Sequence, residues 1–136
     1  KVLPSRCWRA LLARVKKKGF AFDLTPEYVE AVFETQEGKC ALTGWPIRFA
    51  TNAKINTASI DRIDSTKGYV MGNVQLTDKR VNRCKLDNEE DVFYAMCKAV
   101  AANRQNDFEP IAVEWEWDVL NDTEHPIRQR VLLPIP

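Results

Sequence analysis

The stretch from Ser59 to Lys85, "SIDRIDSTKGYVMGNVQLTDKRVNRCK", constrains the fold more than any other part of the sequence. Apolar residues flank polar ones in "SIDRI" and again in "NVQLT". This alternation predicts two short strands, over 58–63 and 73–77, that are joined through a turn at "STKGY". Asp78 then stands where a carboxylate can accept hydrogen bonds from the first N–H groups of a helix over 79–85. The pattern predicts a strand, turn, strand and helix in that order.

Polar residues mark the ends of these predicted elements. Asp61 ends the first strand, Asn73 precedes the second, and Asn82 follows nine residues later on the helix. A short strand and one helical turn fit in that interval, so the helix can bring Asn82 back beside Asp61. Carboxylate and amide oxygens are hard ligands that suit Mg²⁺ or Mn²⁺. The spacing favours a single-metal phosphodiesterase site, and the alternative is a strand-end ion pair of Asp61 with Arg62.

The same stretch resembles the HNH, or ββα-metal, nuclease motif, in particular the phage-type group with a DRID…GY…N…N pattern. The upstream segments "RVKKKGFAFDLTPEYV" and "GKCALTGWPIRF" are similar to those that precede the motif in such proteins, so the resemblance covers roughly residues 10–100. It implies an α+β fold, with a ββα-metal core, amino-terminal helices and a carboxy-terminal extension. It also implies a metal-dependent DNA endonuclease that nicks or cleaves both strands, and a cytoplasmic location in the host cell if the protein is phage-encoded.

The resemblance implies a role for each matching residue. Asp61 and Asn82 match metal ligands, with Asn standing where the last His of the motif is common. Asn73 matches the middle Asn of the catalytic motif, which typically holds the loop. Lys85 matches a basic residue that could reach a phosphate.

Arg62 departs from the common pattern, in which a His at this position deprotonates the attacking water. Because a guanidinium stays protonated in proteins, Arg62 cannot be that base. We expect it to bind the scissile phosphate instead. Tyr69 on the adjoining turn is the first candidate for the base, metal-bound hydroxide is the second, and Asp64 and the sole histidine, His125, follow. A catalytically inactive HNH scaffold that binds DNA or protein is the competing interpretation.

Charge is distributed unevenly along a chain whose net charge is only +1. Residues 1–20 carry seven basic and no acidic residues, and residues 107–124 carry seven acidic and no basic ones. The basic end suits DNA, and the acidic segment could serve a protein partner. The expected DNA contacts are Lys16, Lys17, Lys18, Lys67, Arg80 and Lys85.

The flanking segments predict further helices. One covers 6–18 and ends at Gly19, and a second begins after Thr25 with Pro26 in its first turn. A third follows Asp87 and is expected to turn Val92, Phe93, Met96, Cys97 and Val100 inward. We expect an HNH-like nuclease domain over 1–102 and an extension over 103–136. In the extension, "IAVEWEW" alternates like a strand, and "IRQRVLLPIP" could form a strand, a clasp or a partner-binding arm.

Several classes of protein are not expected from this sequence. No apolar run is long enough to span a membrane. The cysteines, Cys7, Cys40, Cys84 and Cys97, form no CxxC pair. A structural zinc site is therefore not expected, and reduced thiols are. The oligomeric state and the DNA target are not encoded in any pattern that we identify.

Overall fold

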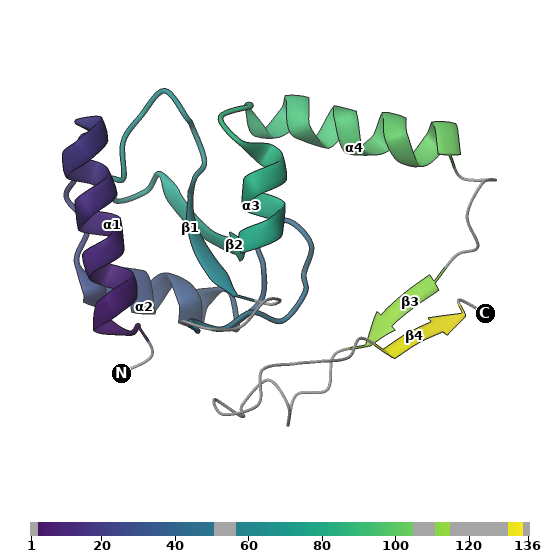
Figure 1. The fold of residues 1–136 in the computed structure, drawn as a ribbon, viewed down its shortest axis with the longest axis horizontal. Coiled ribbons are helices and arrows are strands. Elements are labelled where there is room, and N and C mark those ends of the chain that lie inside the picture. The colour runs from purple at the N-terminus through teal and green to yellow at the C-terminus, as the bar shows by residue number, and fades with distance from the viewer. Residues whose placement is uncertain (1–2, 51–56, 105–110, 115–130, 135–136) are drawn as a thin grey trace.

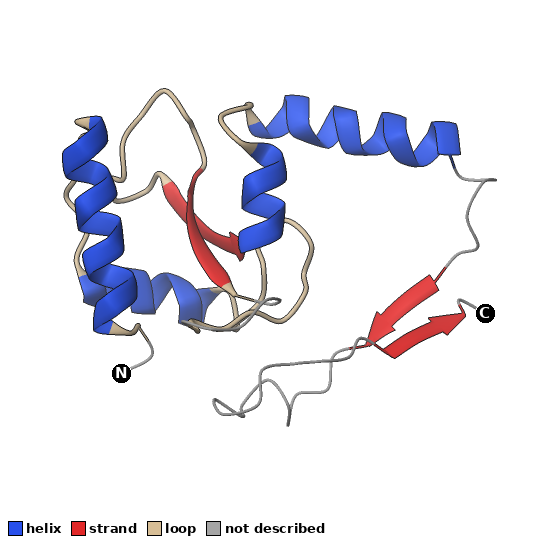
Figure 2. Ribbon diagram, viewed as in Figure 1, coloured by secondary structure: helices blue, strands red, loops and turns tan. Residues whose placement is uncertain are grey.

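The computed structural model describes residues 3–50, 57–104, 111–114 and 131–134 (Figure 1). Helices and short antiparallel strands alternate along the chain, which confirms the expected α+β class (Figure 2). The elements are α1 (Ser5–Lys18), α2 (Pro26–Thr35), β1 (Ala58–Arg62), β2 (Val74–Asp78), α3 (Lys79–Lys85), α4 (Glu90–Arg104), β3 (Ile111–Glu114) and β4 (Val131–Pro134).

Strands β1 and β2 form an antiparallel hairpin that runs directly into α3. Their register pairs Ala58 with Asp78 and Arg62 with Val74. The Asp78 carboxylate accepts a hydrogen bond of 2.8 Å from the backbone N–H of Arg80, so this residue caps α3. The predicted strand, turn, strand and helix are therefore confirmed. We call residues 58–85 the ββα unit.

Helices α1 and α2 precede the ββα unit and supply much of its core. Leu11 and Val15 from α1 and Val29 from α2 are buried together with Leu76 of β2. Gly19 ends α1 in the left-handed conformation, with φ of 70°. Thr25 caps α2 by accepting a hydrogen bond of 3.1 Å from the Tyr28 N–H. Both helices begin and end close to their predicted limits.

The segment between α1 and α2 holds the turn of the hairpin from outside. Phe22 forms a bridge with Tyr69, and the Asp23 N–H donates to the Tyr69 carbonyl at 3.3 Å. The Asp23 carboxylate also accepts a hydrogen bond of 2.7 Å from the Met71 N–H. A Cβ built on Gly68 would lie 2.1 Å from the Ala21 carbonyl oxygen, so only glycine fits this approach.

The outer edge of β2 is covered by residues that follow α2. The Gln36 side-chain amide donates to the Leu76 carbonyl at 2.8 Å and accepts from the Leu76 N–H at 2.9 Å, as a neighbouring strand would. The Ala41 N–H also donates to the Leu76 carbonyl. Cys40 is buried in the core and its Sγ accepts from the Asp78 N–H at 3.2 Å, so this thiol has a packing role.

The expectation for the helix after Asp87 is wrong in two respects. The helix, α4, begins at Glu90 rather than directly after Asp87, and none of its residues is buried. Val92, Met96 and Val100 are 46%, 47% and 64% exposed. The apolar periodicity was real, but no element in the described part of the chain covers that face.

The extension contributes one antiparallel pair in its described part. Strand β3 pairs with β4, from Ile111 with Pro134 to Glu114 with Val131. The strand expected in "IAVEWEW" is thus confirmed at its start, and the tail contains a strand. The division of the chain at residue 102 falls in the last turn of α4 and stays a prediction. Within the described residues, no helix is both long and apolar enough to cross a bilayer.

Candidate functional site

A polar cavity of about 430 Å³ opens beside β1 and α3. Four of the five residues predicted from the sequence as metal ligands or catalytic groups line it: Asp61, Arg62, Tyr69 and Asn82. Asn73 lies behind them in the hairpin turn. We call this space the site cavity, because it brings together side chains that lie up to 21 positions apart in the sequence.

Asp61 is buried and paired with a lysine that is equally buried. The Lys85 ammonium donates to Asp61 Oδ2 at 2.9 Å and to Oδ1 at 3.1 Å, and Gln75 donates to Oδ2 at 3.0 Å. A third bond from the ammonium reaches the Arg62 carbonyl at 2.8 Å. Lys85 is 0% exposed and Asp61 is 4% exposed. Asp61 therefore forms an ion pair, but with Lys85 on α3 and not with Arg62 beside it.

Asn82 faces β1 at Ser59, which precedes Asp61 by two residues and lies on the same side of the strand. Its Nδ2 donates to Ser59 Oγ at 2.8 Å. One turn of α3 separates Asn82 from Lys85, a rise of about 4.5 Å. Ser59 and Asp61 are about 6.6 Å apart along the strand, a comparable distance. Asn82 therefore contacts Ser59 while Lys85 contacts Asp61. The Asn82 side chain reaches the site cavity but contacts Ser59, and Lys85 takes the place beside Asp61.

The oxygen atoms at the site are of the kind that a hard divalent cation requires. With Asn82 Nδ2 bonded to Ser59, its Oδ1 is the acceptor left for a ligand. Asp61 offers about four lone-pair positions, of which three are used by Lys85 and Gln75, so Oδ1 retains one. The donor set fits Mg²⁺ or Mn²⁺ with water or phosphate completing the shell. Within the described residues, no three His, Cys, Asp or Glu side chains gather as a metal-binding group.

Arg62 is held by the turn and by an aromatic ring. Its Nη1 donates to the Ser65 carbonyl at 2.8 Å and to the Lys67 carbonyl at 3.1 Å. The guanidinium carbon lies 4.2 Å from the centre of the Phe20 ring, a cation–π distance. These contacts fix the guanidinium plane at the cavity wall, while the N–H groups on Nε and Nη2 remain available to a phosphate.

The candidate bases differ in their surroundings. Tyr69 is 5% exposed, lines the cavity, and its hydroxyl accepts a long hydrogen bond of 3.4 Å from Arg14. The Asp64 carboxylate instead binds the N–H and hydroxyl of Thr66, at 2.9 and 2.6 Å. These bonds, with Lys67 nearby, lower the pKa of Asp64 below its ordinary value, so it is a poorer base. His125 lies outside the described residues.

Asn73 holds the hairpin turn through three hydrogen bonds. Its Nδ2 donates to the carbonyls of Asp64 and Gly68, at 3.0 and 2.9 Å, and its Oδ1 accepts from the Asp64 N–H at 2.9 Å. The side chain is buried and spans the turn from one end to the other. The geometry is that of a turn-holding residue, the role that the sequence resemblance implied.

The expected DNA contacts are not gathered at the site cavity. For Lys85 the expectation is wrong, because its ammonium is buried against Asp61 and cannot reach a phosphate. Arg80 forms a two-point ion pair with Asp78, at 2.8 and 3.0 Å, which raises the pKa of its guanidinium. Lys67 lies 3.6 Å from Asp64 on the exposed side of the turn. Lys16, Lys17 and Lys18 are exposed at the end of α1.

Other basic residues line the site cavity and were missed from the sequence. They are Arg14 on α1 and Lys79 and Arg83 on α3. Their signal was spacing: Arg6, Ala10 and Arg14 recur every four residues, as do Lys79 and Arg83, so each set shares one helix face. Lys16–Lys18 do not line the site cavity, and their contact with DNA stays a prediction.

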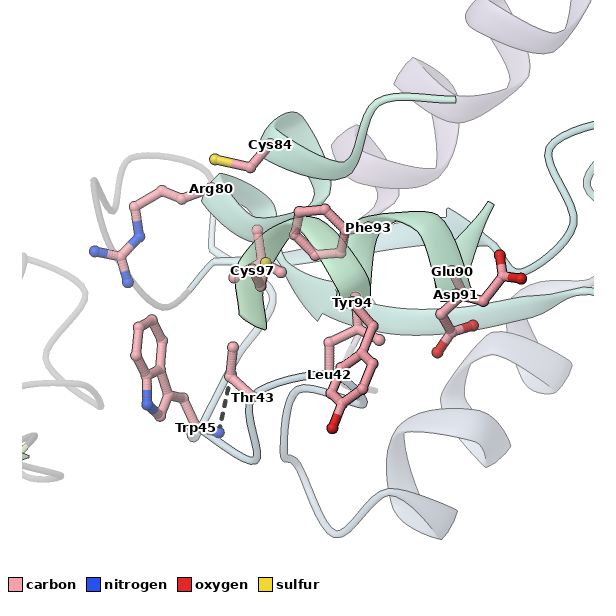
Figure 3. Close-up of a pocket in the computed structure, with 11 residues that line it drawn as sticks. Leu42, Thr43, Trp45, Arg80, Cys84, Glu90, Asp91, Phe93, Tyr94 and Cys97 are labelled. Atoms are coloured by element: carbon pink, nitrogen blue, oxygen red, sulfur yellow. Dashed lines mark hydrogen bonds between the residues drawn. The ribbon is translucent and has the colours of Figure 1, made fainter. Parts of the chain in front are cut away.

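A larger cavity, of about 730 Å³, lies on another side of α3. Figure 3 shows Trp45 and Leu42 from the loop after α2 across from Phe93, Tyr94 and Cys97 of α4. Its lining is mainly apolar, and it contains none of the predicted catalytic or metal-binding side chains. The larger volume therefore does not identify the functional site. The predicted metal-binding and catalytic side chains Asp61, Arg62, Tyr69 and Asn82 line the smaller, polar cavity instead.

Comparisons with known proteins give one structural likeness. Neither the family models nor the curated proteins contain a match to this chain. A solved structure described as the "rare-cutting HNH restriction endonuclease PacI", whose "extraordinary mechanism of DNA perturbation" was studied, is 20% identical with a TM-score of 0.44. The likeness covers 76% of this chain and 80% of that one.

Proposed function

We propose that this protein is a metal-dependent DNA endonuclease of the HNH type. The observation that carries the proposal is the meeting of Asp61, Arg62 and Asn82 at one polar cavity of a ββα unit. One acid, one fixed guanidinium and one amide oxygen are a minimal set for hydrolysing a phosphodiester. The resemblance of the sequence between Ser59 and Lys85 to the HNH motif supports the same reading.

Each side chain has a distinct part in the proposed reaction. Asp61 and Asn82 would hold Mg²⁺ or Mn²⁺, which when bound supplies charge stabilisation for the phosphate and the leaving 3′ oxygen. Arg62 would bind the scissile phosphate through its free N–H groups. Water attacks phosphorus as the bond to the 3′ oxygen breaks, Tyr69 is the proposed acceptor of the proton that the water loses, and solvent supplies a proton to the 3′ oxygen. Lys85 would hold the Asp61 carboxylate in position, and Asn73 would keep the turn in place.

A nicking assay on supercoiled plasmid tests the proposal. The full chain is incubated with Mg²⁺, with Mn²⁺ and with EDTA, and relaxed and linear products are quantified. We expect nicking that needs a divalent ion, is lost in Asn82→Ala and Asp61→Asn, and is retained in Arg9→Gln, which changes a residue of α1 that does not line the site cavity. Circular dichroism of each variant separates lost chemistry from lost folding. Failure of the wild type to nick with either ion would overturn the enzyme assignment.

One observation favours a second function, a non-catalytic DNA-binding module on the same scaffold. The carboxylate that should bind the metal already has a buried counter-charge in Lys85. An ion pair of this kind can serve structure alone. DNA binding that survives EDTA, together with an absence of nicking under all divalent ions, is the result expected for this alternative.

A further inference from the structure

The site cavity continues into a neighbouring cavity of about 230 Å³ with a mixed polar and apolar lining. The two share Arg14, Ser59, Ile60 and Lys79 in their linings, so they are parts of one depression between α1 and α3. We call the joined cavities the basic groove. In Figure 1, α1 and α3 lie on either side of the β1–β2 hairpin, whose first strand forms the floor of this groove.

The basic groove carries cations on both walls. Arg6 and Arg14 come from α1, and Lys79 and Arg83 come from α3. Among the described residues that line either cavity, Asp61 is the only carboxylate, and its charge is balanced by Lys85. In the described part of the chain, none of the four cations forms an ion pair with an acidic residue.

The two walls are close enough for their charges to act on the same atom. Cys7 lies in the groove, and burial raises the pKa of its thiol, while the charges of Arg6 and Lys79 oppose that rise. Arg6 from α1 and Lys79 from α3 line the same cavity as this thiol, and the charge of each acts on it. A set of like charges held together without acidic partners is an unfavourable arrangement unless an anion occupies it.

The dimensions of the groove suit a polyanionic strand rather than a single phosphate. Arg6 and Arg14 are eight residues apart on α1, a rise of about 12 Å. One strand of duplex DNA carries a phosphate roughly every 3.4 Å of axis, so that rise covers about three to four phosphates. The polar side chains Ser59 and Asn82 continue from there to Asp61 and Arg62.

We propose that the basic groove is the path of the cleaved DNA strand, and that Arg6, Arg14, Lys79 and Arg83 bind the phosphates next to the scissile one. The proposal rests on the nuclease function proposed above and adds to it the direction from which the strand reaches Asp61. It assigns phosphate binding on α1 to Arg6 and Arg14, which precede Lys16–Lys18, the sequence-based expectation, along the helix.

The test compares three charge-removing pairs in the full chain. Arg6→Gln/Arg14→Gln removes one wall and Lys79→Gln/Arg83→Gln removes the other. Arg9→Gln/Lys98→Gln removes the same number of charges from exposed residues of α1 and α4 that do not line the groove, and it is the matched control. Binding to a fluorescent duplex is measured by anisotropy in EDTA at about 50 to 200 mM KCl. Phosphate contacts dominate the salt dependence of binding in this range. Thermal unfolding shows whether each pair remains folded.

Each lost phosphate contact lowers the slope of log affinity against log salt by about 0.9. Each groove pair should therefore reduce the slope by about 1.8, and the fourfold rise in salt should weaken binding about twelvefold less than in wild type. The control pair should keep the wild-type slope. An equal or larger change in the control, or wild-type slopes in both groove pairs, would overturn the groove, as would an absence of binding by wild type.

This result is separable from the outcome of the nicking assay. If the wild type nicks DNA while both groove pairs bind with wild-type slopes, the groove assignment fails and the nuclease remains. If the groove pairs lose salt-dependent binding while no divalent ion supports nicking, the groove stands as a DNA-binding surface and the nuclease fails.

Discussion

Replacing Lys85 by methionine should destabilise this protein more than any exposed charge removal. The Lys85 ammonium is 0% exposed and donates three hydrogen bonds, two to Asp61 and one to the Arg62 carbonyl. Methionine fills similar volume without charge, so the Asp61 side chain is left buried with only Gln75 as a donor. Removing one member of a buried pair typically costs about 3–5 kcal/mol. The free energy of unfolding of a typical domain is about 5–15 kcal/mol, so this loss would be roughly a third or more of the stability of an average domain.

The assay is urea unfolding followed by circular dichroism, with two comparison variants. Lys67→Met removes an exposed lysine that lies 3.6 Å from Asp64, and it should cost less than about 1 kcal/mol. The double variant Asp61→Asn/Lys85→Met removes both buried charges, and it should recover most of the stability that Lys85→Met loses. If Lys85→Met unfolds at the wild-type urea concentration, or if the double variant is no more stable than Lys85→Met, the buried pair does not have the energetic role argued here.

Three further predictions concern the turn and the proposed base. Gly68→Ala should lower stability by about 1–3 kcal/mol in urea unfolding, because the new methyl group meets the Ala21 backbone, and an unchanged midpoint would contradict that contact. The pKa of Asp64 is lowered mainly by its bonds to Thr66, so its stabilising effect is present above its ordinary pKa of 3.8 and is lost as pH falls through the lower folded value. The stability difference between wild type and Asp64→Ala should therefore shrink below about pH 3.8, and a difference independent of pH would count against the hydrogen-bonded carboxylate. Tyr69→Phe should slow plasmid nicking by about 100-fold or more with unchanged DNA binding, and wild-type rates would remove Tyr69 as the proton acceptor.

Local patterns predicted the ββα unit because each of its signals acts over a few residues. Alternation over five residues defines a strand, and the Asp78 carboxylate can cap a helix only from the position where it stands. Thr25 and Pro26 defined the start of α2 in the same way. These features depend on backbone geometry close to each residue, so they could be identified without knowing the tertiary structure.

The partners of the charged residues could not be predicted in that way. Whether Asp61 contacts Arg62, Asn82 or Lys85 depends on how α3 lies along β1. A shift of α3 by one helical turn would exchange the positions of Asn82 and Lys85 relative to the strand. The basic groove likewise requires two helix faces from distant segments to oppose each other. For α4, periodicity revealed an apolar face but carried no information on what covers it.

The hydrogen bonds that Asp23 and Gln36 make with the hairpin have a consequence for how this unit can be used. The turn takes its shape partly from Asp23, and the edge of β2 is completed by a side chain from the end of α2. An isolated peptide over residues 58–85 would lack both and would expose an unpaired strand edge. The ββα unit is therefore not self-sufficient, and a chimaera that contains it must also contain residues 20–41, which include α2.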